Sequence, residues 1–250
     1  MSGRNDPRLD ALLRRIEACR ICAGVLGHEP RPVVQAGTGA RILVAGQAPG
    51  RKVHESGVPW DDASGRRLRE WLDIDEATFY DPQQVALVPM GFCYPGKAGS
   101  GDAPPRPECR ATWHPLLLPL LPDTGLVLAI GQYAQRYHLG DRHKGSLTAN
   151  LRAWREFLPG LVPLPHPSPR NVAWFKANPW FEGEVLPGVR ARVRELVGRG
   201  AGSQERVERN EERVKARAGA CHSPERGNPG ASFPRTREPT DVHGSPRSRG

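Results

Sequence analysis

Four short runs of apolar residues punctuate the first 197 residues of the chain. They are Ile42–Ala45, Val85–Met90, Leu126–Ile130 and Leu161–Leu164. Each run is continuous and does not alternate with polar residues, which is typical of strands that are buried on both faces of a parallel sheet. We therefore expect four parallel strands, each ending in a polar loop.

Apolar positions at helical spacing fill the segments between these runs. The predicted helices lie roughly at Gly65–Leu72, Glu108–Leu118, Gln132–Leu139 and Leu147–Phe157, and Leu9, Leu12, Leu13 and Ile16 indicate another before the first strand. The alternation of strand and helix predicts an α/β fold, a three-layer α/β/α sandwich around a central four-stranded parallel sheet.

The pattern changes at residue 198. From there to residue 250, Gly, Pro, Ser, Arg and Glu dominate and no apolar period survives. Such a composition buries too little apolar surface to offset the entropy lost on folding, so we expect a disordered basic tail. Residues 1–197 are predicted to form one domain, because about 200 residues suffice for a single compact core.

Charge and hydropathy narrow the class of protein. The chain carries 36 Lys and Arg against 27 Asp and Glu, a formal net charge of +9. This excess suits a polyanionic partner, although a general preference for Arg would produce it too. No apolar run is long enough to span a bilayer and no signal peptide is recognisable, so we expect a cytoplasmic monomer without a membrane partner.

Four cysteines fall within the predicted domain. Cys19 and Cys22 form a CxxC pair at the end of the first predicted helix, and Cys93 and Cys109 follow the second strand. In a reducing compartment such residues serve as metal ligands or free thiols more often than as disulfides. A four-thiolate set suits structural zinc or a 4Fe-4S cluster, and unconnected buried thiols are the remaining alternative.

Two loops at strand ends contain the residues best suited to a ligand site. GQAPG at residues 46–50 follows the first strand, and HPSPRN at residues 166–171 follows the fourth. Ligands of parallel α/β sheets bind beyond the carboxyl ends of the strands. We therefore expect these loops to face each other across one pocket, with the Gly91–Arg106 loop joining the same rim.

These segments resemble the motifs of the uracil-DNA glycosylase superfamily, over residues 16 to about 197. GQAPG, followed by GVPW at residues 57–60 and ASG at 63–65, resembles the first motif of its iron–sulfur families, which reads GEAPG and then GxPF. HPSPRN resembles the second motif of the single-strand-selective monofunctional uracil glycosylases. The cysteines match the iron–sulfur pattern, and the resemblance implies that Cys19, Cys22, Cys93 and Cys109 hold a structural 4Fe-4S cluster.

The same resemblance assigns roles in base removal. His166 would donate a hydrogen bond to the departing base, whose developing negative charge is best stabilised by preorganised donors. Flipping a base out of DNA costs a few kcal/mol, so a wedge is needed, and Arg170, between Pro169 and Asn171, is our candidate. Ser168 would contact the target phosphate. The aromatic residues from Trp174 to Phe181 suit either stacking on DNA or packing on the sheet.

The first motif departs from the family pattern. Gln47 stands where the iron–sulfur families usually carry Glu, and an amide can position water but cannot accept its proton. Asp61 or Asp62 can compensate, because a broad-specificity thermophilic branch places an acid that aligns with Asp62. The alternative role for both is an N-cap pair for the helix that starts near Ser64.

The residues expected to bind the base also differ from the family. Trp60, in the position of the family's stacking Phe, is predicted to bind the base together with Ala48 and Pro49. Between Val88 and Phe92 there is no side-chain amide, although the family usually reads the base with an Asn there. Because this amide is missing, the base that the protein removes could be hypoxanthine or xanthine as an alternative to uracil.

The sequence therefore leaves three hypotheses for the function of the protein. We expect a monofunctional DNA glycosylase of base excision repair, which hydrolytically removes a deaminated base, uracil first, from DNA. Gln47 and the missing amide favour a non-catalytic DNA-binding protein of the same fold as one alternative. A zinc-stabilised protein that acts on a nucleotide metabolite is the other, and iron and sulfide analysis would separate it from the first two.

Overall fold

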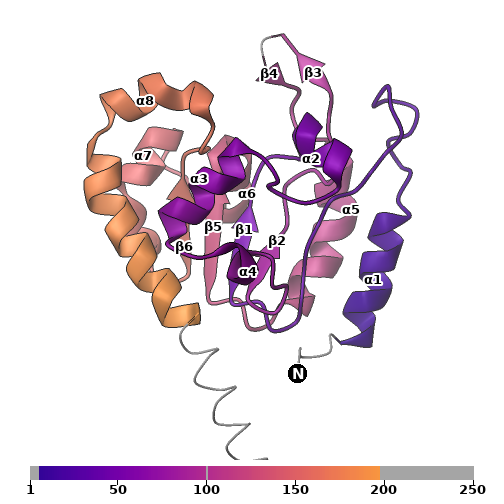
Figure 1. Ribbon diagram of the computed structural model, residues 1–250, viewed down its shortest axis with the longest axis horizontal. Coiled ribbons are helices and arrows are strands. Elements are labelled where there is room, and N and C mark those ends of the chain that lie inside the picture. Colours follow the sequence, from indigo (N-terminus) through magenta and orange to yellow (C-terminus); the bar gives the residue numbers. More distant parts are fainter. Residues whose placement is uncertain (1–5, 100, 198–250) are drawn as a thin grey trace, which may run out of the picture. The chain divides into compact units, whose positions relative to one another are not determined.

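The computed structural model describes residues 6–99 and 101–197 of the chain, and the predicted tail at 198–250 lies outside the described residues (Figure 1). Its central sheet contains β1 (Ile42–Ala45), β2 (Val85–Leu87), β5 (Leu126–Ile130) and β6 (Leu161–Leu164) in the order β2-β1-β5-β6. All three neighbouring pairs are parallel. The predicted fold class and four-stranded parallel sheet are confirmed, whereas the domain boundary at residue 198 stays a prediction.

Three of the four strands have the predicted bounds, and β2 ends earlier, at Leu87. Pro89 has no N–H and so interrupts the ladder. The chain nevertheless continues beside β1, because the backbone N–H groups of Val88 and Met90 donate to the carbonyls of Val44 and Gly46. This pairing carries the loop after β2 along the GQAPG loop.

Helices connect and cover the strands. They are α1 (Pro7–Glu17), α2 (Arg51–Ser56), α3 (Ala63–Leu72), α4 (Glu76–Phe79), α5 (Pro107–Leu117), α6 (Gly131–Leu139), α7 (Leu147–Arg152) and α8 (Val172–Ala177), followed by a helical segment at 186–197. The predicted helix Leu147–Phe157 is divided into α7 and the 3-10 turn η3 (Trp154–Phe157). A small hairpin of β3 (Lys97–Ala98) and β4 (Gly101–Asp102) stands above the sheet in Figure 1.

Alternate strand residues enter the cores on opposite faces of the sheet. Ile42 and Val44 of β1 pack in the core that includes α3 and the segment 186–197. Leu43, between them, packs with α1 and α5 on the other face. Because successive side chains of a strand point to opposite sides, this division shows helices on both faces, as a three-layer sandwich requires (Figure 1).

Within residues 6–99 and 101–197, no helix is both long enough and apolar enough to cross a membrane.

Candidate active site

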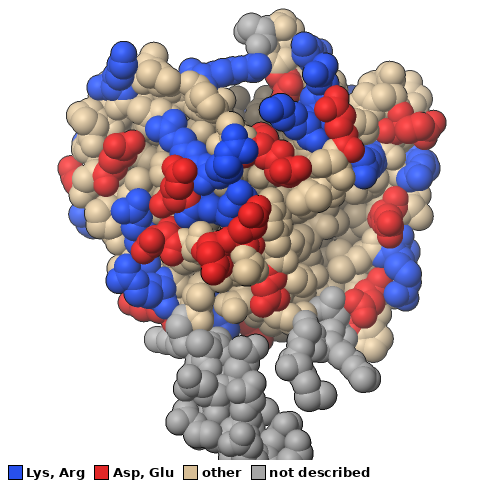
Figure 2. All heavy atoms as spheres, in the orientation of Figure 1, with Lys and Arg blue, Asp and Glu red and all other residues tan. Residues whose placement is uncertain are grey.

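A cavity of about 470 Å³ opens at the carboxyl ends of β1 and β6. Gln47, Ala48 and Pro49 line it from the loop after β1, Trp60 and Asp62 from the segment before α3, and His166, Ser168, Pro169 and Arg170 from the loop after β6. The expectation that the two loops face one pocket is confirmed. Figure 2 shows Lys and Arg side chains gathered around the hollowed upper end of the molecule.

The cavity is also lined by charged and polar residues that the sequence analysis did not identify. Arg51 and Lys52 come from α2, and Tyr94, Lys97 and Asp102 from the loop between β2 and α5. The sequence pointed to this loop as part of the rim, but it gave no signal for the individual side chains. Basic residues at the mouth suit the phosphates of a nucleic acid.

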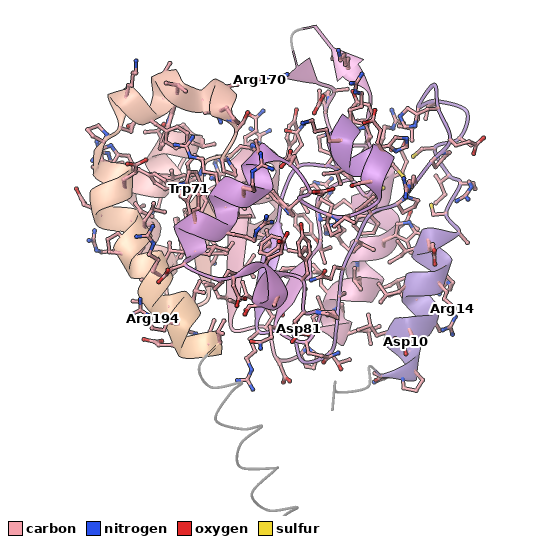
Figure 3. All side chains as sticks on the ribbon, viewed as in Figure 1. Asp10, Arg14, Trp71, Asp81, Arg170 and Arg194 are labelled. Atoms are coloured by element: carbon pink, nitrogen blue, oxygen red, sulfur yellow. The ribbon has the colours of Figure 1, made fainter. Side chains whose placement is uncertain are left out.

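The loop that carries His166 is held by its own side chains. The Asn171 amide donates to the His166 carbonyl oxygen at 2.8 Å, and the Ser168 hydroxyl accepts from the Arg170 N–H at 3.2 Å. Asn171 is not among the residues that line the cavity, so its described contact is with the loop itself. Figure 3 places Arg170 at the upper edge of the molecule.

A buried polar network fixes the end of β6, two residues before His166. The Gln135 amide donates to the Leu164 carbonyl oxygen at 2.9 Å, and the Asn150 amide donates to Gln135 Oε1 at 2.9 Å. Both side chains are fully buried. The sequence reasoning missed this network, which gives the histidine loop a rigid start.

His166 is partly buried and faces two carboxylates. Burial lowers the pKa of His166, and the charges of Asp62 and Asp102 partly offset this effect. The lowered pKa favours the neutral imidazole at neutral pH, which has one N–H donor and one acceptor nitrogen. The N–H of the neutral ring can still donate a hydrogen bond to an anion that develops in the cavity.

Trp60 forms one wall of the cavity in a strained conformation. Its φ of 58° is rarely adopted by bulky residues. Its ring stacks on His166 with a centroid distance of 5.8 Å, a separation typical of two rings in contact. No third ring fits between them, so a base would lie against an outer face of this pair.

Asp62 combines the two roles that the sequence left open. One oxygen, Oδ1, accepts from the Gly65 N–H at 2.8 Å and caps α3, while the side chain also lines the cavity. Asp61 is exposed and is not among the cavity-lining residues. The N-cap function is therefore confirmed for Asp62, and of the two acids it is Asp62 that reaches the cavity.

Gln47 is anchored by its amide. Its Nε2 donates to the Ala103 carbonyl oxygen at 3.1 Å, at the base of the β3–β4 hairpin. A carbonyl can only accept, so this contact fixes which end of the amide faces the hairpin. The side-chain oxygen Oε1 is left as the acceptor.

Among the aromatic residues after the histidine loop, Phe181 is buried in the core, and Trp174, Phe175 and Trp180 are partly buried and pack against it. Trp71 of α3 makes edge-to-face contacts with Phe175 and Phe181, at centroid distances of 5.6 and 5.0 Å. Trp174 contacts the same two rings. Their packing role, one of the two alternatives from the sequence, is confirmed by these contacts.

The four cysteines line a second, smaller cavity between the end of α1, the loop after β2 and the start of α5. Cys22, Cys93 and Cys109 are buried and Cys19 is half-buried. Burial raises the pKa of Cys22 and Cys109, and it raises the pKa of Cys93 to about 12. The Phe92 N–H donates to Cys109 Sγ at 3.4 Å.

Four thiols are suitable ligands for a metal ion or an iron–sulfur cluster. Their positions in this structure, however, do not form a ready-made binding site for either group. Across the described residues, no three His, Cys, Asp or Glu side chains are placed to hold one metal ion, as a zinc site requires. The free space between the side chains is about 10 Å³, close to that of one water molecule. A cluster would need a wider site.

The family comparison agrees with the position of the larger cavity. The family model described as "Uracil DNA glycosylase superfamily" matches residues 34–190. This match covers more than half of the chain and includes both loops that form the cavity. Membership supports a DNA glycosylase role in general terms. The chain belongs to the uracil DNA glycosylase superfamily.

Proposed function

We propose that this protein is a monofunctional DNA glycosylase that hydrolyses the bond between a deaminated base, uracil first, and its deoxyribose. The observation that carries the proposal is the convergence of His166, Asp62 and Gln47 on one cavity with a basic mouth. This arrangement also favours catalysis over the non-catalytic DNA-binding alternative, because simple binding has no need of carboxylates facing an imidazole.

Recognition of DNA would begin with the cations at the mouth. Arg51 and Lys52 are exposed residues of α2 that line the cavity and can neutralise phosphates. Arg170, at the opposite rim, would enter the duplex as the base flips out and so repay part of the few kcal/mol that unstacking costs. The flipped base would then lie against the exposed face of the Trp60 and His166 ring pair.

The chemistry requires charge stabilisation at both ends of the breaking bond. A neutral His166 would donate to the base oxygen on which negative charge develops, a contribution worth about 3 kcal/mol for one well-placed donor. Asp62, whose second oxygen is not used by the α3 cap, would stabilise the cationic sugar. Gln47 Oε1 would accept a hydrogen bond from the attacking water.

Two lysines near the cavity raise a specific alternative to hydrolysis. Lys52 and Lys97 line the cavity, and a lysine amine can attack the sugar to form a Schiff base. Neither belongs to the motifs that resemble the family, so we propose simple hydrolysis. Borohydride trapping checks this point, because a covalent adduct between protein and DNA would indicate lyase chemistry.

We further propose that Cys19, Cys22, Cys93 and Cys109 hold a structural 4Fe-4S cluster. Four thiols around one largely apolar cavity are the ligands that such clusters use, and the group would tie the end of α1 to α5. Iron and acid-labile sulfide should be present in equal amounts in protein purified without oxygen. Zinc in their place would support the alternative structural site.

The decisive experiment is single-turnover base release from oligonucleotides. Single- and double-stranded substrates carrying uracil, hypoxanthine or xanthine would be incubated with wild type, His166→Ala and Asp62→Asn. Asn retains an N-cap oxygen, so Asp62→Asn removes the charge and spares α3. We expect the best substrate to lose about 100- to 1000-fold in rate with His166→Ala.

The matched control is Asp123→Asn. Asp123 is exposed and lies three residues before the start of β5, at the end of the sheet opposite the cavity. It should release base at the wild-type rate. If folded wild-type protein binds DNA but releases none of the three bases, the glycosylase proposal fails in favour of the non-catalytic binder.

A further inference from the structure

We propose that Asp102 is a further catalytic residue, the carboxylate that accepts the proton of the attacking water, and that Gln47 is the residue that positions it. The inference rests on the proposed glycosylase function and adds to it a residue outside both sequence motifs. It starts from the hairpin that brings Asp102 to the same cavity as His166.

The hairpin is fixed at its base, beside Asp102. Asp102 lies opposite Lys97 in the antiparallel pair of β3 and β4. The Ala103 N–H donates to the Gly96 carbonyl oxygen at 2.9 Å, which closes the hairpin. The Ala103 carbonyl oxygen in turn accepts from Gln47 Nε2 at 3.1 Å. Gln47 therefore ties the residue next to Asp102 to the loop after β1.

The Asp102 carboxylate reaches the GQAPG loop. A methyl group built on Gly50 would lie 3.8 Å from Asp102 Oδ2, an ordinary contact distance, so the carboxylate lies against this loop. Its charge acts on His166 across the cavity and on Tyr94 beside it. The cations that line the cavity from these two elements are Lys97 of the hairpin and Arg51 and Lys52 of α2.

Asp102 is better suited to accept a proton than the two motif residues. The Gln47 amide has no proton-accepting charge, and its nitrogen is held by Ala103. Asp62 has one oxygen committed to the Gly65 N–H. Within the part of the chain that the structure describes, no residue donates a hydrogen bond to the Asp102 carboxylate, so both of its oxygens can accept. Asp102 is exposed, and a DNA strand across the mouth would desolvate it.

With Asp102 as the proton acceptor, the hydrolysis of the glycosidic bond proceeds as follows. The water oxygen forms a bond to C1′ as Asp102 accepts one of the water protons. The electron pair of the C1′–N bond leaves with the base, and His166 stabilises the resulting anion through a hydrogen bond. The base takes up a proton and Asp102 returns its proton to solvent. The products are the free base and an abasic sugar with a C1′ hydroxyl.

The test is single-turnover base release from the preferred oligonucleotide, measured together with DNA affinity. General-base catalysis contributes about 100- to 10,000-fold, so Asp102→Asn should lose at least about 100-fold in rate. DNA affinity should be unchanged or higher, because a negative charge has been removed from the mouth.

Further variants separate positioning from chemistry. Asp102→Glu keeps a carboxylate and should restore part of the rate. Gln47→Ala should lower the rate by a smaller factor than Asp102→Asn. Asp123→Asn is again the control and should match wild type in rate.

The outcomes distinguish the inference from the function on which it rests. If Asp102→Asn keeps the wild-type rate while Asp62→Asn loses it, base release stands and Asp62 is the proton acceptor. If Asp102→Asn loses rate only in proportion to weaker DNA binding, the residue positions DNA and the inference is overturned. If wild type releases no base, the proposed function and the inference both fail.

Discussion

Trp60 shows how single residues shape this cavity. Its positive φ brings its backbone against Gly65 and its ring against Gly46. A methyl group on Gly65 would lie 1.8 Å from the Trp60 carbonyl oxygen, and one on Gly46 would lie 2.9 Å from its ring. The stacking of Trp60 on His166 therefore depends on two positions without side chains.

We predict that Gly65→Ala destabilises the protein by more than about 2 kcal/mol, because the clash is with backbone that cannot rotate away. Gly183→Ala is the matched control. Its added methyl group meets nothing within 4 Å, and the change should be neutral or slightly stabilising. Urea denaturation measures both, and equal stability of the two variants would contradict the prediction.

At this scale the sequence predicted residues that follow strands directly and missed those brought in by tertiary contacts. Gln47 and His166 lie just beyond β1 and β6, so topology alone places them at one edge. Asp102 reaches the same cavity only because a hairpin folds back on the loop after β1. The residue pattern around Asp102 in the sequence does not indicate this long-range contact.

The end of β6 is an element whose position depends on polar side chains. Gln135 of α6 and Asn150 of α7 link these helices to the Leu164 carbonyl oxygen. Lys144 completes the network by donating its N–H to Asn150 Oδ1 at 2.7 Å. A change here should therefore reach the histidine loop through the strand.

We predict that Gln135→Leu lowers the free energy of unfolding by about 1 to 3 kcal/mol, because it leaves the Leu164 oxygen and the Asn150 amide buried without partners. Base release should fall with it, because His166 lies two residues after Leu164. Gln132→Leu, on the exposed side of the same helix, is the control. Denaturation and single-turnover release measured on both variants check the prediction, and a fully stable Gln135→Leu protein would refute it.

Among the elements, long buried runs were predictable and short polar ones were not. β1, β5 and β6 match their apolar runs because both faces of each strand are covered. α2 has six residues with one buried side chain, and the strands of the β3–β4 hairpin have two residues each. Such elements form through contacts with the rest of the fold, so periodicity along the chain cannot reveal them.

At the scale of the whole molecule, the cysteine cavity and the larger cavity are distinct, but the same chain segment contributes residues to both. Cys93 and Tyr94 are neighbours in sequence, yet the first lines the cysteine cavity and the second lines the larger cavity. The Arg31 guanidinium donates to the His54 and Glu55 carbonyl oxygens at the end of α2, both at 2.7 Å. A group bound by the cysteines would therefore hold, through Cys93, the segment that carries Tyr94 to the larger cavity.

Four histidines make the stability of the folded protein depend on pH. Burial lowers the pKa of His54, His114 and His166, and it lowers the pKa of His138 to about 4. The unfolded chain binds protons at these sites near pH 6.5, whereas the folded protein binds them only at lower pH. Stability is therefore fully present above about pH 6.5 and is lost as the pH falls towards the folded values.

We predict that the free energy of unfolding decreases by a few kcal/mol between about pH 6.5 and pH 4.5, a range above the ordinary titration of most carboxylates. His138 alone should account for about 2 kcal/mol of the loss by pH 4.5, because its pKa is lowered to about 4 in the folded protein. His138→Phe fills similar space without a proton site, so its stability should depend less steeply on pH. Urea denaturation of both proteins across this range measures the difference. Parallel curves for the two proteins would show that the buried imidazole of His138 does not set the acid stability, and the loss would then have to come from His54, His114 and His166.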